Sequence, residues 1–185
     1  MSAPNVSDQQ RKFTVVGLDL SVTGTGIAYR DGSTSTVKTK QKDGDHRLTQ
    51  IEEAVQIAVG GEHLNLGPAV DLVVMEDIPQ NSHAAKPIAM VHGVVRNLLN
   101  KQGIPYALVV AASLKFYATG KGSGDKVPMA LAAYKRAGLE FEDDNQCDAA
   151  WLRWAGLDWL GCPELSLPPV QRAALKKATW PEVQR

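Results

Sequence analysis

The chain has 185 residues, which is long enough for one domain with a complete hydrophobic core. Its hydrophobic content of 44% and charged content of 22% are ordinary for a globular protein. Twenty basic and twenty acidic residues give a net charge of zero, which neither requires nor excludes a nucleic-acid partner. No apolar run approaches the roughly 18 residues of a membrane-spanning helix, so we expect no membrane partner.

The two cysteines and the polar N-terminal residues bear on compartment and domain limits. Cys147 and Cys162 stand in apolar helical contexts without a CxxC pair, which indicates buried thiols and a cytoplasmic protein. Residues 1–12 are polar and lack the apolar core of a signal peptide, so we expect a disordered leader. One domain is predicted over residues 13–161, followed by a C-terminal extension over residues 162–185.

Hydrophobic periodicity predicts a succession of strands and helices along this domain. Alternating and glycine-punctuated segments at its start predict three antiparallel strands. Two later apolar runs predict buried strands, and apolar residues at helical spacing predict the helices. In chain order, we expect a hairpin over Phe13–Tyr29, a strand over Ser33–Lys40, a helix over Arg47–Val59, a strand over Asp71–Ile78, a helix over Ile88–Lys101, a strand over Tyr106–Ala112, and helices over Lys126–Ala137, Asp143–Leu160 and Gln171–Trp180.

Acidic residues stand at the ends of two predicted buried strands. Asp19 lies between Leu18 and Leu20, just before a glycine-rich turn that would let a ligand approach the backbone closely. Glu76 ends the apolar run of the fourth strand. Burying such a carboxylate is costly unless it is paired or bound to a metal ion. Both positions are therefore candidate metal ligands.

A third candidate lies in the predicted helix over residues 143–160. Asp148 follows Asp144 and Asn145 by four and three residues, a spacing that places these side chains on one helix face. Either Asp143 or Asp144 can cap the helix. Oxygen ligands that converge from separate elements suit Mg²⁺ or Mn²⁺, and two such ions can activate a water and stabilise the leaving oxygen of a phosphodiester.

The predicted order of elements is that of the α/β ribonuclease H-like fold. That fold is a mixed five-stranded sheet, with three antiparallel strands followed by two parallel ones, flanked by helices on both faces. Its metal-binding acids come from the first strand, the end of the fourth strand and a C-terminal helix. Here those places hold Asp19, Glu76 and Asp148.

The sequence resembles the RuvC family of Holliday junction resolvases, of the phage type, over roughly residues 13–161. The family's Asp and Thr-Gly motif matches GLDLSVTGTG, its strand ending in Glu matches VVMEDIP, and its last acidic motif matches DDNQCDAAWL. A pair of lysines on either side of a glycine-containing loop matches Lys115 and Lys126 around TGKGSG. Each motif alone is weak, but the four occur in the family's order on the expected elements.

The resemblance implies a Mg²⁺-dependent crossover junction endodeoxyribonuclease with two ions per site, in which Mn²⁺ can substitute. It implies a homodimer that acts on branched DNA such as a four-way junction, in the cytoplasm of the host cell if the chain is phage-encoded. The implied catalytic residues are Asp19, Glu76, Asp148 and Lys126. The implied metal ligands are the same three acids with Asp144 or Asn145, and the implied DNA contacts are Lys115, Lys126, Lys121 and Ser123.

Two positions depart from the family pattern. Asn145 stands where the family usually has a second acid or a histidine, so Asp144 would have to substitute or the second metal would be held more weakly. In bacterial members an aromatic residue after the Glu acts as a wedge in the junction, and the matching position here is Pro79. Junction opening would therefore use another residue or differ in extent.

Two other classes of protein share features of this sequence. Actin-like and sugar-kinase-like ATP-binding domains begin with a similar Asp-containing turn, but they need two such domains and a second phosphate loop. A non-catalytic DNA-binding module on the same fold is the second alternative, although clustered acids repel DNA unless metal ions neutralise them. Cleavage of a four-way junction with Mg²⁺ and no nucleotide separates the three classes.

Overall fold

The computed structural model describes residues 13–61, 69–79, 85–122 and 126–183, and the expected leader lies outside them. A mixed sheet in the order β3-β2-β1-β4-β5 forms its centre. The first three strands are antiparallel, and β4 and β5 run parallel to β1, so the sheet expected from the sequence is confirmed. The strands are β1 (Val15–Asp19), β2 (Gly24–Ala28), β3 (Thr34–Lys38), β4 (Leu72–Glu76) and β5 (Tyr106–Val109).

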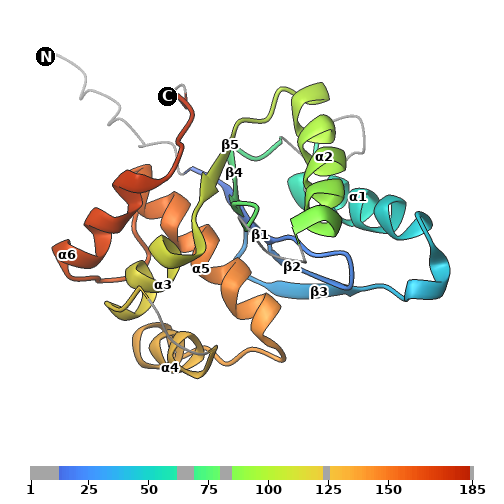
Figure 1. Ribbon diagram of the computed structural model, residues 1–185. Helices are drawn as coiled ribbons and strands as arrows, with labels where there is room; N and C mark the ends of the chain where they lie inside the picture. The colour runs from blue at the N-terminus through green and yellow to red at the C-terminus, as the bar shows by residue number, and fades with distance from the viewer. Residues whose placement is uncertain (1–12, 62–68, 80–84, 123–125, 184–185) are drawn as a thin grey trace, which may run out of the picture.

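Helices cover both faces of the sheet, with α1 and α2 on one side and α3 to α6 on the other (Figure 1). In the described ranges, none of the helices combines the length and the apolar character needed to cross a membrane. The helices are α1 (His46–Val59), α2 (Ala85–Lys101), α3 (Ala111–Thr119), α4 (Lys126–Ala137), α5 (Asp144–Trp159) and α6 (Pro169–Arg172), with 3₁₀ turns at Gln41–Asp43 and Ala173–Lys177.

Alternation along the central strands divides the buried residues into two cores. In β1, Val15 belongs to the core under α5, whereas Val16 and Leu18 belong to the core under α1 and α2. In β4, Val74 faces α5 and Met75 faces the other side. Successive side chains of a strand point to opposite faces. Asp19, which follows Leu18, and Glu76, which follows Met75, therefore both point toward α5.

The sequence predicts a strand over Tyr106–Ala112 and no helix directly after it, so α3 is a finding of the structure. The strand ends at Val109, and a helix starts at once after Val110, which adopts extended backbone angles. The signal was present in the sequence: Leu114, Tyr117 and Ala118 follow helical spacing and are buried. Gly120 then ends the helix in the left-handed conformation that glycine favours.

The C-terminal extension packs against α3 and α5. Leu165, Leu167 and Leu175 are buried in the core on that side of the sheet. Thr179 pairs with Leu108 in an antiparallel bridge, so backbone from the extension covers part of the outer edge of β5. The predicted helix over Gln171–Trp180 is instead α6 followed by the 3₁₀ turn, which ends before Ala178.

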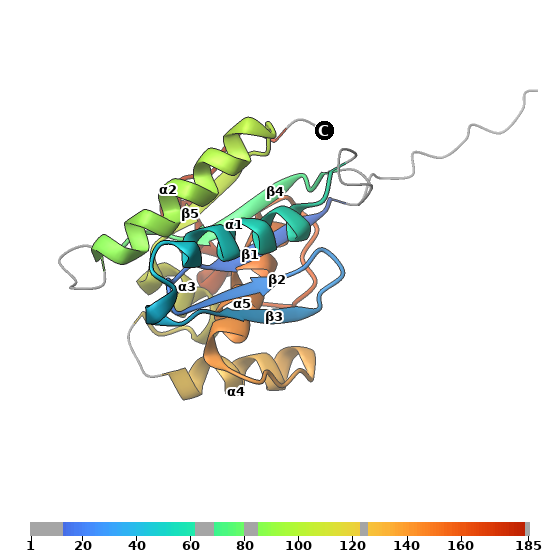
Figure 2. The ribbon, with the colours of Figure 1, turned by 90° about the vertical axis from the view of Figure 1, so that its right-hand side faces the viewer.

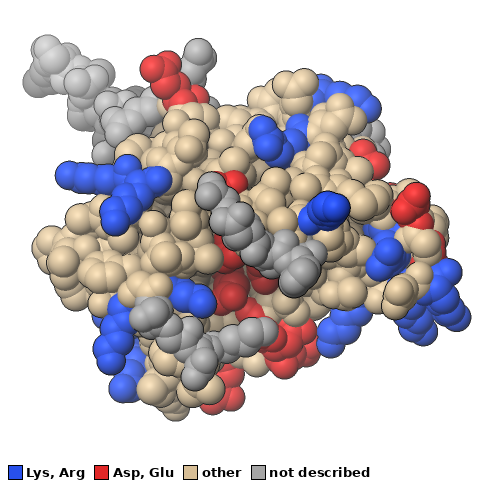
Figure 3. All heavy atoms as spheres, viewed as in Figure 1, with Lys and Arg blue, Asp and Glu red and all other residues tan. Residues whose placement is uncertain are grey.

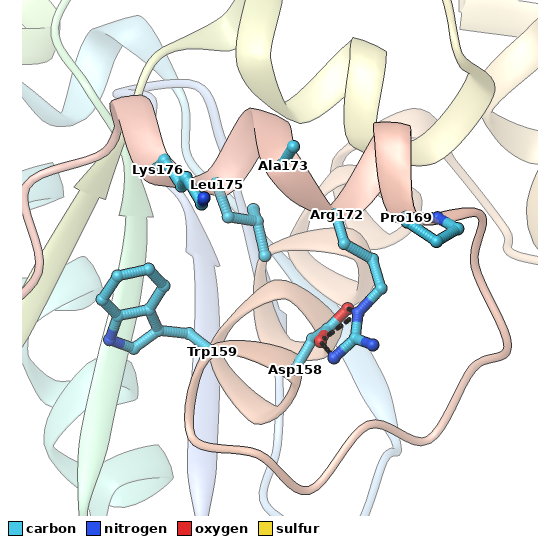
Figure 4. A pocket seen from close by; sticks show the side chains of 7 residues that line it. All are labelled: Asp158, Trp159, Pro169, Arg172, Ala173, Leu175 and Lys176. Atoms are coloured by element: carbon cyan, nitrogen blue, oxygen red, sulfur yellow. Dashed lines mark hydrogen bonds and ion pairs between the residues drawn. The ribbon is translucent and has the colours of Figure 1, made fainter.

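An ion pair attaches this extension to the end of α5. Figure 4 shows the guanidinium of Arg172 directed onto the carboxylate of Asp158, with Trp159 and Leu175 lining the adjacent hollow. The side chain of Asp158 is only 3% exposed, and the Tyr117 hydroxyl also donates to it at 3.2 Å. A buried carboxylate is thereby paired and hydrogen-bonded.

Candidate active site

Two of the expected acids lie side by side at the carboxyl ends of parallel strands. Asp19 is the last residue of β1 and Glu76 is the last residue of β4. Leu18 is paired with Met75, so the next residue on each strand lies at the same level of the sheet. Both side chains point toward α5 because the strands alternate in phase. Asp77, one residue later, points to the opposite face by the same alternation.

Helix α5 brings Asp148 to the same place because glycines in the sheet let it approach closely. A β-carbon on Gly17 of β1 would lie 2.6 Å from the backbone nitrogen of Arg153. A β-carbon on Gly26 of β2 would overlap the backbone carbonyl of Asn145. Gly26 is the residue that pairs with Asp19. The N-terminal half of α5 therefore lies directly over the end of β1.

Asp148 lies close enough to Glu76 for its negative charge to affect the pKa of Glu76. The pKa of Glu76 is raised to about 7, first by burial and then by the negative charge of Asp148, while Lys115 on α3 acts in the opposite direction. Two carboxylates in a poorly solvated place disfavour each other's charged forms. A cation between them would relieve this cost, so the electrostatics of the pair suit a metal ion.

The acidic side chains gather in the middle of one face of the molecule, with basic side chains on either side (Figure 3). The two ribbon views show that this face lies at the carboxyl ends of β1 and β4, beside the start of α5 (Figures 1 and 2). Ligands of open α/β sheets bind at this end of the strands. The acids are therefore placed where a substrate can reach them.

The donor set fits a hard divalent cation, because it offers carboxylate and amide oxygens from two strands and a helix. Over the residues that the structure describes, no three His, Cys, Asp or Glu side chains are grouped tightly enough to hold an ion as they stand. The chemical character of Asp19, Glu76 and Asp148, together with the raised pKa of Glu76, is thus the observation that favours a metal ion.

Asp143 caps α5. Its Oδ1 accepts a hydrogen bond from the backbone N–H of Gln146 at 3.1 Å and another from the Thr36 hydroxyl at 2.8 Å. Lys38 of β3 lies 3.6 Å from the second carboxylate oxygen. Burial acts to raise the pKa of Asp143, but these bonds and Lys38 together lower it. The sequence left Asp143 and Asp144 as alternatives, and the geometry selects Asp143.

Asp144 and Asn145 occupy the first turn of α5, and both are half-buried. The amide nitrogen of Asn145 would lie 3.2 Å from a β-carbon on Gly24, so its side chain lies against β2 near the end of β1. Since Asp143 supplies the cap, the carboxylate of Asp144 is not needed for that purpose. Of these two residues, Asn145 is the one whose contacts are described near the acids. It lies against Gly26, which pairs with Asp19.

The structure describes only some of the basic and polar residues expected to contact DNA. Lys115 lies within electrostatic reach of Glu76. Lys121 is exposed just after α3, where its backbone N–H donates to the Thr119 hydroxyl. Lys126 is the first residue of α4, but its side chain and all of Ser123 lie outside the described part of the chain. The structure therefore brings Lys115 to the acids, and it does not test the other three expected DNA contacts.

The comparisons with known proteins concern the fold. The sequence matches no protein-family model and no curated protein. The structure of Thermus thermophilus RuvC matches it with a TM-score of 0.61 at 20% identity, over 83% of this chain and 100% of that chain. T. thermophilus RuvC in complex with a Holliday junction substrate matches with the same score and identity, over 83% of this chain and 99% of that one. The chain therefore has the RuvC-like, ribonuclease H-like fold that the resemblance implied.

Proposed function

We propose that the protein is a metal-dependent endonuclease that hydrolyses phosphodiesters of branched DNA, with the four-way junction as its main substrate. The observation that supports this most strongly is the placement of Asp19, Glu76 and Asp148 on one side of a RuvC-like sheet, where burial and Asp148 raise the pKa of Glu76. The same-fold T. thermophilus protein is bound to a Holliday junction substrate. We place the activity in the cytoplasm.

The residues that would hold two Mg²⁺ or Mn²⁺ ions are Asp19, Glu76 and Asp148, with Asp144 or Asn145 as a fourth ligand. When bound, the ions would supply an activated water and offset charge on the leaving oxygen. Glu76 must be ionised to take part, so its raised pKa makes proton binding and metal binding compete. Asn145 would contribute an oxygen without charge.

Basic residues would bind the DNA backbone around these acids. Lys115, whose charge already acts on Glu76, is the one best placed for the phosphate to be cut. Lys126 would add its amine to the N-terminus of α4, where a helix favours anions. Lys121 and Ser123 would contact neighbouring phosphates from the glycine-rich loop. These contacts would make binding dependent on salt.

Symmetrical cleavage of two strands would require a homodimer, because a C₂ dimer matches the symmetry of the junction. The apolar stripe of α2 does not supply this interface. Its residues Val91, Val95 and Leu98 are buried in the protomer's own core. The outer side of α2 is still available to contact a partner subunit. Met90 is half-exposed there, and a β-carbon on Gly93 would have no atom within 4 Å.

A synthetic four-way junction tests the proposal. The protein is incubated with the junction, Mg²⁺ and no nucleotide, and with a linear duplex of the same arm sequences as the control. We expect paired symmetrical nicks in the junction and an intact duplex. ATP turnover would favour the kinase-like class instead, and retarded but uncut DNA in both Mg²⁺ and Mn²⁺ would favour a non-catalytic DNA-binding module.

A further inference from the structure

Two exposed lysines stand at the carboxyl end of β3, an edge strand of the sheet. Lys38 is the last residue of β3, and its side chain is 75% exposed. Lys40 is also exposed and has extended backbone angles, and between them the Thr39 N–H donates to the Thr23 carbonyl at 3.2 Å. The chain therefore keeps its strand direction as far as Lys40. Lys38 and Lys40 are called the β3 lysines below.

Contacts with α5 show which face of the sheet the β3 lysines occupy. The Thr36 hydroxyl donates to Asp143, the cap of α5, at 2.8 Å, and the Lys38 amine lies 3.6 Å from the other oxygen of the same carboxylate. Side chains two residues apart on a strand share a face. Lys38 and Lys40 are therefore on the face toward α5, which is also the face of the candidate metal-binding acids.

The register of the sheet gives the position of Lys38 relative to Asp19. Gly26 pairs with Asp19 on one side and with Thr36 on the other, so these three residues lie at one level. Since β3 runs in the same direction as β1, Lys38 lies two residues beyond that level, at the carboxyl edge. Two strand spacings across and two residues along separate the Cα atoms of Lys38 and Asp19 by roughly 12 Å. At a rise of about 3.4 Å per nucleotide, phosphates three to four nucleotides apart span this separation.

The acids lie between the β3 lysines and Lys115 along the carboxyl edge. The strand order is β3-β2-β1-β4-β5, with Asp19 on β1, Glu76 on β4 and Lys115 on the helix that follows β5. Figure 3 shows acidic side chains in the middle of this face and basic side chains on both sides. A polyanion lying across the edge would therefore meet positive charge on each side of acids that metal ions neutralise.

The amines of the β3 lysines are available to an anion. The ion pair of Lys38 with Asp143 lies at the surface, where such pairs contribute little to stability and a phosphate can compete. Lys40 forms no ion pair with any residue in the described ranges. Lys42, further along the chain, is followed by Asp43 and Asp45, so nearby acids offset its charge. The two lysines that continue the strand are thus the ones best suited to bind phosphate.

We propose that Lys38 and Lys40 bind the DNA backbone, and that the strand to be cut runs across the carboxyl edge from α3, over the acids, to the end of β3. This inference rests on the proposed function and deepens it, because it gives the path of the DNA strand over the candidate site. The β3 lysines bind phosphates a few nucleotides from the cleavage position and touch no reacting atom. The competing role for charged residues on an edge strand is to prevent pairing with another sheet.

Binding of the protein to a four-way junction in Ca²⁺, measured over a range of salt concentrations, tests this path. Lys40→Gln removes one charge, and the double variant Lys38→Gln/Lys40→Gln removes both. The double variant Lys38→Arg/Lys40→Arg keeps both charges. Lys101→Gln is the matched control, because exposed Lys101 ends α2 just before the chain enters β5 at the opposite edge of the sheet.

The slope of log affinity against log salt concentration should become shallower by about 0.9 in Lys40→Gln and by about 1.8 in the double Gln variant. It should stay unchanged in the Arg variant and in Lys101→Gln. An unchanged slope in both Gln variants, with or without self-association, or an equal change in Lys101→Gln, would overturn the proposal. The single Lys40→Gln variant still decides the matter if loss of Lys38 beside the α5 cap unfolds the protein.

Uncharged phosphates locate the contact. Methylphosphonates are placed one at a time along a strand that passes through the branch point. At one or two adjacent positions, the replacement should weaken binding by the wild type and add nothing in the double Gln variant, because its partner charge is already absent. Equal effects on both proteins at every position would overturn the proposal. A wild type that bound no branched DNA would defeat the proposed function itself, whereas junction binding that ignores the β3 lysines would defeat only this inference.

Discussion

A β-carbon on Gly26 of β2 would overlap the backbone carbonyl of Asn145 in α5. The helix that carries Asp148 can therefore lie over the end of β1 only because this strand residue has no side chain. Gly24, two residues earlier on the same face of β2, leaves room for the Asn145 amide in the same way. The geometry of the candidate site thus depends on glycines as well as on its acids.

Replacement of Gly26 by alanine should separate α5 from the sheet. Because the methyl group meets backbone rather than a flexible side chain, we expect a loss of about 1–3 kcal/mol in the free energy of unfolding, and loss of junction cleavage. Gly93→Ala is the control, since nothing lies within 4 Å of its β-carbon position and alanine favours helix. Denaturant unfolding of both variants measures the effect, and equal stability would contradict the close contact.

Asp143 and Asp144 should respond differently to replacement by alanine. Asp143→Ala removes the cap and the bond from Thr36, so we expect the free energy of unfolding to fall by about 1 kcal/mol. Asp144→Ala should keep nearly the wild-type stability. If Asp144 is a metal ligand as proposed, its variant should lose activity that Mn²⁺ partly restores. Unfolding curves and a metal titration of the two variants check this, and a larger stability loss in Asp144→Ala would contradict the assignment.

The raised pKa of Glu76 predicts a pH dependence of stability in metal-free protein. The pKa rises from 4.5 to about 7 on folding, so the folded state binds the proton more tightly. The favourable contribution is therefore fully present below pH 4.5 and is lost as pH rises through about 7. We expect this loss between those limits in the wild type and not in Glu76→Gln. Denaturant unfolding in a chelator across this range would reveal it, and parallel curves would contradict it.

The neighbours of Glu76 should shift that titration in opposite directions. Asp148→Asn removes a negative charge and should lower the pKa of Glu76, whereas Lys115→Ala removes a positive charge and should raise it. Carbon NMR of the Glu76 carboxyl group in metal-free protein measures both. An unchanged midpoint in the Asp148 variant would mean that the two acids do not interact, and the candidate site would lose its main electrostatic support.

Arg172 should stabilise the fold rather than the chemistry. Arg172→Ala leaves the buried carboxylate of Asp158 with the Tyr117 hydroxyl and no paired charge, so we expect a loss of about 1–3 kcal/mol in the free energy of unfolding. Adding Asp158→Asn should recover part of this loss, because the amide needs no counter-charge. Lys176→Ala, in the same hollow but exposed, is the control and should change little (Figure 4). Cleavage should continue in all of these variants that fold.

Much of the fold was predictable because its signals are local. The apolar run that ends in Glu76 and the turn after Asp19 mark strand ends. The order of elements then places both acids at the carboxyl ends of neighbouring parallel strands. The existence of α3 was missed because Val109 and Val110 continue the apolar run of β5 into the first residues of the helix. Periodicity from Leu114 onward carried the correct signal.

The parts that sequence could not supply depend on contacts between distant residues. The choice of Asp143 as the cap depends on Thr36, which lies 107 residues earlier in the chain. From sequence alone, an apolar stripe on α2 that packs in the protomer's own core cannot be distinguished from one that forms a dimer surface. Both roles require the same spacing of apolar residues.

Cleavage of a four-way junction by Asp148→Asn, compared with the wild type under single-turnover conditions, tests the central claim most directly. The variant keeps the size of the side chain and removes its charge, and junction binding is measured in parallel in Ca²⁺. If Asp19, Glu76 and Asp148 form the metal-binding centre, cleavage should be abolished while binding stays intact or tightens, because repulsion of phosphate falls. Full cleavage by Asp148→Asn would contradict the site assignment.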